Sequence, residues 1–240
     1  MKVFAIGDLH FSGLPPTKPM EIFGSHWENH RDKLCKAWQE QVQDEDLVFV
    51  VGDTSWAMRL DVAVDDLTAI ANLPGSIYLI RGNHDYWWSS LSKMNKAMNN
   101  ALHFLQGHGT AIGPIAFGGT RGYLCPNDTA FDAEHDTSIY ARELLRTEAS
   151  LQEMEKALEA NGYKDSDEAV RILLLHYPPF NDKNEASGFT DLLAAYNVDH
   201  CIFGHLHDKS SFQRIPKQFG STELHLVSAD YMNFTIKEIL

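Results

Sequence analysis

Five short apolar segments of this 240-residue chain each run directly into a polar residue of a metal-binding type. In four of the five, a glycine precedes that residue, so the backbone there can turn sharply and approach its neighbours closely. If the segments are strands of an α/β sheet, the polar side chains meet in the crevice at the carboxyl ends of the strands. The residues concerned are Asp8, His10, Asp53, Asn83, His84, His176, His205 and His207.

The types of side chain in this set indicate a site that binds more than one metal ion. Imidazole and carboxylate ligands without a thiolate suit Mn, Fe, Zn or Ni. Two carboxylates, one amide and four or more imidazoles exceed the ligands that one tetrahedral ion uses. A pair of ions about 3.5–4 Å apart, bridged by a carboxylate and a hydroxide, would use them all. The set therefore predicts a two-metal hydrolytic site.

Taken singly, each of these residues has an ordinary structural explanation. Asp8 or Asp53 alone is more typical of a helix N-cap or a turn than of a metal ligand. Asn83 and His84 fit a tight turn, and His176 fits the end of a strand. These explanations do not account for a ligand type at every one of the five strand ends, whereas a shared metal site does.

The elements that must position these residues alternate along the first half of the chain. Nearly continuous apolar runs of strand length indicate buried strands, and amphipathic stretches between them indicate helices. This alternation favours an α/β fold, and because no linker or repeat interrupts it we expect a single domain, residues 1–240. Strands are expected at 3–6, 47–51, 77–80, 115–118, 172–175 and 201–203, helices at 27–42, 60–73, 89–98 and 136–160, and exposed antiparallel strands at 211–215, 223–228 and 234–239.

The charge balance restricts the partners that the chain can bind. There are 20 Lys and Arg residues against 33 Asp and Glu residues, which gives a formal net charge of −13. A charge of this sign repels the phosphate backbone and argues against nucleic acid as a partner. A small phosphorylated substrate remains compatible, because bound metal ions create a local positive charge.

Three features of the sequence bear on the compartment. No apolar run approaches the roughly 20 residues that a membrane-spanning helix needs. The three cysteines form neither a C-x-x-C motif nor a disulfide framework, which suits a reducing compartment. The first residues do not resemble a signal peptide. We therefore expect a cytoplasmic protein without a membrane partner; the sequence does not indicate its oligomeric state.

Taken together, the five motifs resemble those of the calcineurin-like metallophosphoesterase superfamily, and the chain is most similar to its small bacterial phosphohydrolases. The resemblance implies a four-layer α/β/β/α sandwich with two central mixed β-sheets flanked by helices. It also implies a metal-dependent phosphoesterase that cleaves a small phosphodiester or phosphomonoester. The motifs stand in the family's order: Asp8-x-His10, Gly52-Asp53, Gly82-Asn83-His84-Asp85, His176 and Gly204-His205-x-His207.

The same resemblance implies a role for each residue. Two divalent or trivalent ions, Mn or Fe with Zn or Ni as alternatives, would be bound, and a metal-bound hydroxide would attack phosphorus. His84 would not bind metal but would face the phosphoryl group and assist at the leaving oxygen. Asp85 would orient a neighbouring group. Asp8, His10 and His207 would hold the first ion, Asn83, His176 and His205 the second, and Asp53 would bridge both.

The substrate itself is less defined by these motifs. The residues after Gly52-Asp53, and Asp85 after His84, differ from the protein serine/threonine phosphatases of the superfamily. The lipid-A-pathway hydrolases of the superfamily typically have Arg in place of His84, so this chain does not resemble that branch either. Arg121 is the candidate for a phosphate contact, because its planar guanidinium matches phosphate oxygens. Segments that could line the mouth of the site are 11–30, 86–88 and 121–135.

Two other functions share the motifs. A nuclease would use the same metal site, but the chain has no basic run to follow a nucleic-acid strand. A non-catalytic metal-binding scaffold would usually lack a ligand or the substrate-facing histidine, and neither is missing here. His26 and His30, four residues apart, are expected on a solvated helix face, with a third metal site as the alternative. Cys201 is expected to be a small buried strand residue. Ordinary surface or core positions are expected for His103, His108, His135, His200 and His225.

Overall fold

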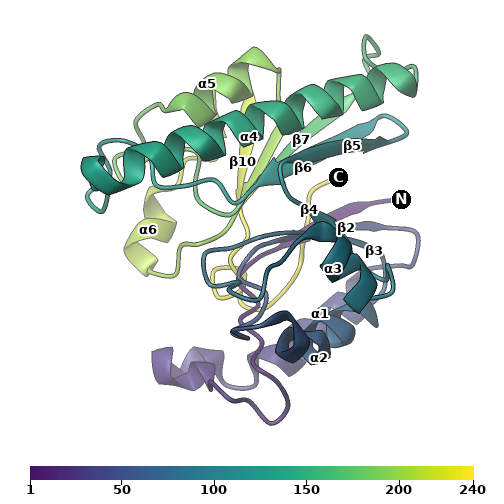
Figure 1. The fold of residues 1–240 in the computed structure, drawn as a ribbon, viewed down its shortest axis with the longest axis vertical. Coiled ribbons are helices and arrows are strands. Elements are labelled where there is room, and N and C mark those ends of the chain that lie inside the picture. Colours follow the sequence, from purple (N-terminus) through teal and green to yellow (C-terminus); the bar gives the residue numbers. More distant parts are fainter. The chain divides into compact units, whose positions relative to one another are not determined.

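The computed structural model describes residues 1–240, which divide into two compact units. Unit 1 comprises Met1–Phe104 with Val227–Leu240, and unit 2 comprises Leu105–Leu226. Each unit contains its own mixed sheet, its own helices and its own apolar core (Figure 1). The expected α/β class, with two mixed sheets and flanking helices, is confirmed. A single domain spanning 1–240 stays a prediction.

The sheet of unit 1 has five strands in the order β11-β1-β2-β3-β4. The first three strands of the chain run parallel, and β11 runs antiparallel to β1. Every residue of β1 and β2 is buried, as their continuous apolar sequences predict. The strands are β1 (Val3–Ile6), β2 (Leu47–Val51), β3 (Ser76–Ile80), β4 (His103–Leu105) and β11 (Lys237–Glu238).

Helices pack against this sheet through the apolar stripes that the sequence shows. Trp38 of the first helix and Leu67 of the second are fully buried in the same core as the strands. The first helix starts later than predicted, because Asn29 has a left-handed backbone (φ 54°) that cannot continue a helix. The helices are η1 (Met20–Phe23), η2 (Ser25–Trp27), α1 (His30–Gln41), α2 (Leu60–Ala71) and α3 (Leu91–Ala97).

The sheet of unit 2 has six strands in the order β5-β6-β7-β8-β10-β9. The four central strands run parallel, and β5 and β9 run antiparallel at the edges. The strands are β5 (His108–Ile112), β6 (Ile115–Thr120), β7 (Val170–Leu175), β8 (His200–Phe203), β9 (Gln218–Phe219) and β10 (Thr222–Leu226).

The long helix α4 (Ala133–Ala160) packs against β5 and β6 (Figure 1). Gly109 and Gly118 allow this close approach, because a Cβ on either would lie 2.2–2.4 Å from an atom of Ser150. Asn161 caps the C-terminal end of the helix, and Gly162 follows with a φ of 79°. The shorter α5 (Gly188–Ala195) is capped by the Ser187 side chain.

Three predictions for the C-terminal region were wrong in whole or in part. Residues 211–215 are not a strand, because the N–H of Ser211 donates to the Asp208 carboxylate (2.8 Å) and starts helix α6 (Lys209–Arg214). The strand expected at 223–228 is β10, but it pairs parallel rather than antiparallel with β8. In the segment 234–239 only Lys237–Glu238 is a strand. None of the helices is long and apolar enough to cross a membrane.

Candidate metal centre

The loop after β1 carries the first two candidate ligands in an unusual backbone conformation. Asp8 and His10 have φ values of 58° and 49°, and Asp53, after β2, has 49°. Left-handed backbone costs a non-glycine residue roughly 1–2 kcal/mol. The N–H of Asp8 donates to Gly52 O, and the N–H of His10 donates to Asp53 O, both at 2.9 Å. The two loops therefore remain hydrogen-bonded beyond the ends of their strands.

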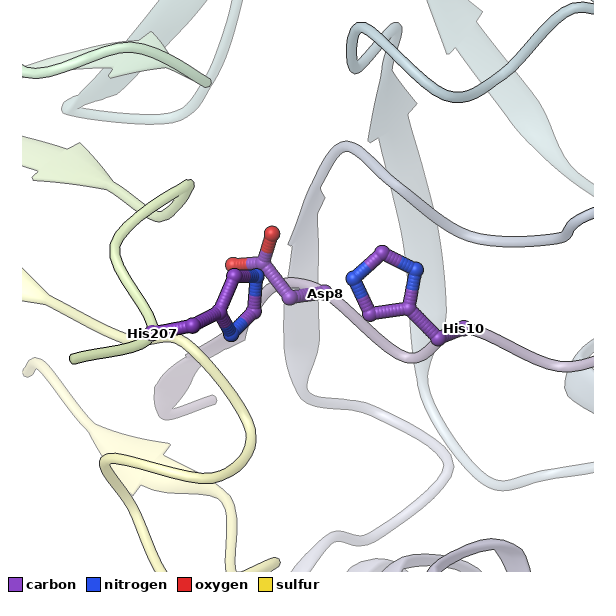
Figure 2. A group of neighbouring side chains, drawn as sticks. All are labelled: Asp8, His10 and His207. Atoms are coloured by element: carbon purple, nitrogen blue, oxygen red, sulfur yellow. The ribbon is translucent and has the colours of Figure 1, made fainter. Parts of the chain in front are cut away.

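These three side chains of unit 1 lie close enough to share metal ions. A carboxylate oxygen of Asp8 lies within 4.8 Å of a ring nitrogen of His10, and one lies within 4.8 Å of a carboxylate oxygen of Asp53. Figure 2 shows Asp8 and His10 on the same loop after β1. All three residues are at most 3% exposed. Because burial of a carboxylate away from water is costly unless hydrogen bonds or a positive charge compensate, this pair of buried aspartates suits bound cations.

The loop after β3 is fastened to Asp53. The backbone N–H of His84 donates to Oδ1 of Asp53 at 2.7 Å. Gly82 comes so near that a Cβ on it would lie 2.1 Å from the same oxygen. Glycine is therefore required at 82, and its loop carries Asn83 and His84 to the side of Asp53.

Asp85 connects the loops after β2 and β3. Its carboxylate accepts the N–H groups of Thr54 (2.8 Å) and Gly82 (2.7 Å), and the indole N–H of Trp87 (2.9 Å). Burial, with a smaller contribution from the charge of Asp53, raises the pKa of Asp85 to about 6, while the backbone N–H donors oppose the rise. Asp85 is thus a positioning residue that fixes the loops carrying the ligands.

The rings of Trp27 and Trp56 form an aromatic wall beside His10, and Trp56 also contacts His84. The Trp56 ring stacks on His10 (centroids 4.8 Å apart, 18° between planes) and lies 4.5 Å from the His84 ring. Trp27 meets His10 edge-on at 5.9 Å. The Lys18 ammonium lies 3.0 Å from the centre of a Trp56 ring, a cation–π contact. Trp56 therefore limits the orientations available to both imidazoles.

Sequence analysis named segment 11–30, which includes Trp27, and the aromatic residues after His84 as candidates for the mouth of the site, but it did not identify Trp56. Trp87 and Trp88 are 1% and 8% exposed in the core of unit 1, and only Tyr86 is exposed. The available signal for Trp56 was its position three residues after Asp53.

Unit 2 brings two of its candidate ligands together. His176 follows β7 and is fully buried, and the N–H of Gly204 donates to its carbonyl at 3.1 Å. His205 follows β8 with a φ of 72°, and its ring lies 5.1 Å from that of His176. The Tyr177 ring lies 4.1 Å from His205. His207, also drawn in Figure 2, is exposed on the same loop as His205.

Arg121 is attached to the segment of His176 through the main chain. Its carbonyl accepts the N–H groups of His176 and Tyr177, both at 3.0 Å. Its guanidinium carbon lies 5.3 Å from the centre of the Tyr123 ring. The candidate phosphate contact is therefore a neighbour of a candidate ligand within unit 2.

A pocket of about 230 Å³ opens beside His205. Tyr123 and Tyr177 line it together with Arg214 of α6. The Arg214 guanidinium donates to Asp182 O (2.6 Å) and to Oγ of Ser211 (2.9 Å), so its charge is held at the pocket wall. Sequence analysis missed Arg214, because it expected the segment to be an exposed strand.

Comparison with known proteins identifies the family. A profile of the calcineurin-like phosphoesterase family matches residues 1–209, which include every candidate ligand. An uncharacterized protein of Methanocaldococcus jannaschii is 32% identical over 84 residues, which are 35% of this chain and 47% of that protein. This chain therefore matches about half the length of that relative.

Two solved structures share the fold. A phosphopantetheinyl hydrolase of Mycobacterium tuberculosis is 15% identical with a TM-score of 0.54, covering 100% of this chain and 95% of the other. A Thermus thermophilus protein is 12% identical with a TM-score of 0.53, covering 99% and 97%. The family profile confirms the resemblance that the five motifs indicate. The chain belongs to the calcineurin-like phosphoesterase family.

Proposed function

We propose that this protein is a metal-dependent phosphoesterase with a dinuclear metal centre. The family profile supports this, because its match includes the ligand loops of both units. The left-handed backbone at four of the seven candidate ligands supports it as well, since such strain concentrates at functional sites. The proposed ligands are Asp8, His10 and His207 for one ion, Asn83, His176 and His205 for the other, and Asp53 for both.

The residues of the chain fit this cofactor by their chemistry. Carboxylate, amide and imidazole donors suit Mn or Fe, with Zn or Ni as alternatives. Two such ions supply positive charge for the phosphoryl oxygens and activate water as a nucleophile at neutral pH. Asp8 and Asp53 are buried, and a bound cation would compensate for the cost of removing their carboxylates from water.

His84 has the place of the proton donor in this mechanism. Its main chain is held by Asp53 and its ring by Trp56, so the imidazole has little freedom to turn away. An imidazole so held can donate a hydrogen bond to a phosphoryl oxygen and deliver a proton to the leaving oxygen. This contact with the reacting group makes His84 the proposed catalytic residue.

The substrate that we propose is a small phosphodiester or phosphomonoester. The pocket beside His205 offers aromatic walls and the Arg214 charge to the group that leaves. The guanidinium of Arg121, a residue hydrogen-bonded to His176 through the main chain, offers a second positive charge. The net charge of −13 argues against a nuclease, since a nucleic-acid strand would be repelled over its whole length.

The single observation that carries the proposal is that Asp8, His10 and Asp53 are buried on two loops that hydrogen-bond to each other. We would remove metal with a chelator and follow hydrolysis of bis-p-nitrophenyl phosphate and p-nitrophenyl phosphate with and without Mn²⁺. The proposal predicts release of p-nitrophenol that depends on added metal. Two bound metals without hydrolysis of either ester would favour the scaffold, and comparable cleavage of single-stranded DNA at physiological salt would favour the nuclease.

A further inference from the structure

Unit 2 contains a second cluster of metal-binding side chains on neighbouring strands. His200 opens β8, and Glu223 and His225 lie on β10. In the parallel register His200 stands opposite Glu223, and Ile202 stands opposite His225. Since alternate residues of a strand share a face, the two histidines and the glutamate lie on one face of the sheet. The other face carries Cys201 and Leu224, which belong to the apolar core under α4.

The donor atoms of the cluster form a compact triangle. Nδ1 of His200 lies 3.0 Å from Nε2 of His225. Oε2 of Glu223 lies 3.8 Å from each of these nitrogens. A tetrahedral Zn²⁺ with bonds of about 2.0–2.1 Å holds its ligand atoms about 3.3–3.4 Å apart. One of the three distances between donor atoms is shorter than this spacing and two are longer. Small side-chain movements would therefore let all three donor atoms bind one ion.

The arrangement of the three side chains favours a bound ion over a simple hydrogen bond between the two imidazoles. The side chains of His200 and His225 are 13% and 9% exposed, while that of Glu223 is 63% exposed. A hydrogen bond between the two imidazoles would explain their 3.0 Å distance. The carboxylate oxygen of Glu223 lies at the same distance from both nitrogens, which is also the arrangement of three ligands around one cation.

We propose that His200, Glu223 and His225 bind a divalent transition-metal ion, with Zn²⁺ the preferred ion. The site lies wholly within unit 2 and is separate from the candidate ligands after β8, because His200 begins the strand whereas His205 follows its carboxyl end. Three protein donors leave a fourth position for water. An ion here would cross-link β8 and β10 and stabilise the folded unit.

The test compares Zn²⁺ binding by the whole protein and by ligand variants. Glu223→Gln is the first variant, because its exposed side chain can be changed without disturbing the core. His200→Asn is the second, and His108→Asn is the matched control, since His108 pairs with Glu153 in unit 2 without a second imidazole. Zinc per chain is measured by plasma mass spectrometry after loading and gel filtration, and affinity by calorimetric titration.

The proposal predicts that wild type and His108→Asn hold one Zn²⁺ more per chain than His200→Asn. Glu223→Gln should weaken the same binding event by at least about tenfold, as loss of a metal contact does. With Co²⁺ as the probe, His200→Asn should lose visible bands that the control retains. Equal zinc content and affinity in all four proteins would overturn the proposal. All four proteins keep the proposed ligands of the dinuclear centre, so differences in zinc content between them do not depend on whether that centre binds metal.

Discussion

The backbone N–H of His84 donates to Oδ1 of Asp53 at 2.7 Å, which couples the proposed catalytic residue to the proposed bridging ligand. The main-chain carbonyl of Asp53 accepts the N–H of His10 at 2.9 Å, which couples a proposed ligand of the first ion to the same residue. A displacement of Asp53 therefore moves His10 and His84 together. The proposed metal centre and the proposed proton donor are parts of one hydrogen-bonded assembly in unit 1.

Replacement of His84 should separate catalysis from metal binding. His84→Asn keeps the main-chain N–H to Asp53 but removes the imidazole, so kcat should fall about 10²–10⁴-fold, the usual contribution of a general acid. Metal content, measured by plasma mass spectrometry, should equal that of wild type. Turnover within threefold of wild type, with the metals retained, would remove His84 from the mechanism.

Gly82→Ala should damage the centre although alanine is small. The new Cβ would lie 2.1 Å from Oδ1 of Asp53, so the carboxylate must move. We expect weaker Mn²⁺ binding by calorimetry together with loss of activity. Gly162→Ala is the control: it strains a left-handed residue in open space, so it should cost roughly 1 kcal/mol of stability and leave metal affinity unchanged. Wild-type Mn²⁺ affinity in Gly82→Ala would contradict the close packing of Gly82 on Asp53.

Trp56 should act through the orientation of the two imidazoles. Trp56→Ala removes the ring that stacks on His10 and contacts His84, and we expect kcat to fall at least about tenfold from misplacement of these groups. Trp56→Phe keeps an aromatic surface and should recover most of the loss. Identical kinetics for the alanine variant and wild type would show that the wall does not position them.

Arg121→Ala should affect the substrate rather than the metals. Loss of a charge-assisted contact to phosphate should lower kcat/KM at least about tenfold. Arg121→Lys keeps the positive charge but lacks the planar guanidinium, so its kcat/KM should lie between those of wild type and Arg121→Ala. Measurement of kcat and KM with both nitrophenyl esters checks this, and an unchanged kcat/KM would exclude Arg121 from the substrate contact.

The strand ends of unit 1 that carry the candidate ligands could be predicted from the sequence because the signal there is local. An apolar run followed by glycine and a metal-binding residue specifies a strand and its loop at Asp8, Asp53 and Asn83. The left-handed backbone at Asp8 and His10 could not be predicted, because only the hydrogen bonds to the neighbouring loop impose it on non-glycine residues.

The features that depend on long-range pairing were the ones missed. His200 and Glu223 meet only because β8 pairs with β10, and both residues look ordinary in sequence.

Helix α6 was mistaken for a strand for a local reason. Its short alternating sequence fits either a helix or a strand, and the Asp208 cap decided for the helix.

The central claim is that two metal ions share one bridged site, and electron paramagnetic resonance of the Mn²⁺-loaded protein tests it most directly. The proposed centre predicts the spectrum of a spin-coupled Mn²⁺ pair, because a shared Asp53 would hold the ions about 3.5–4 Å apart. Asp53→Asn should abolish or weaken the coupling. A wild-type spectrum containing only isolated Mn²⁺ ions at two equivalents per chain would contradict the dinuclear centre.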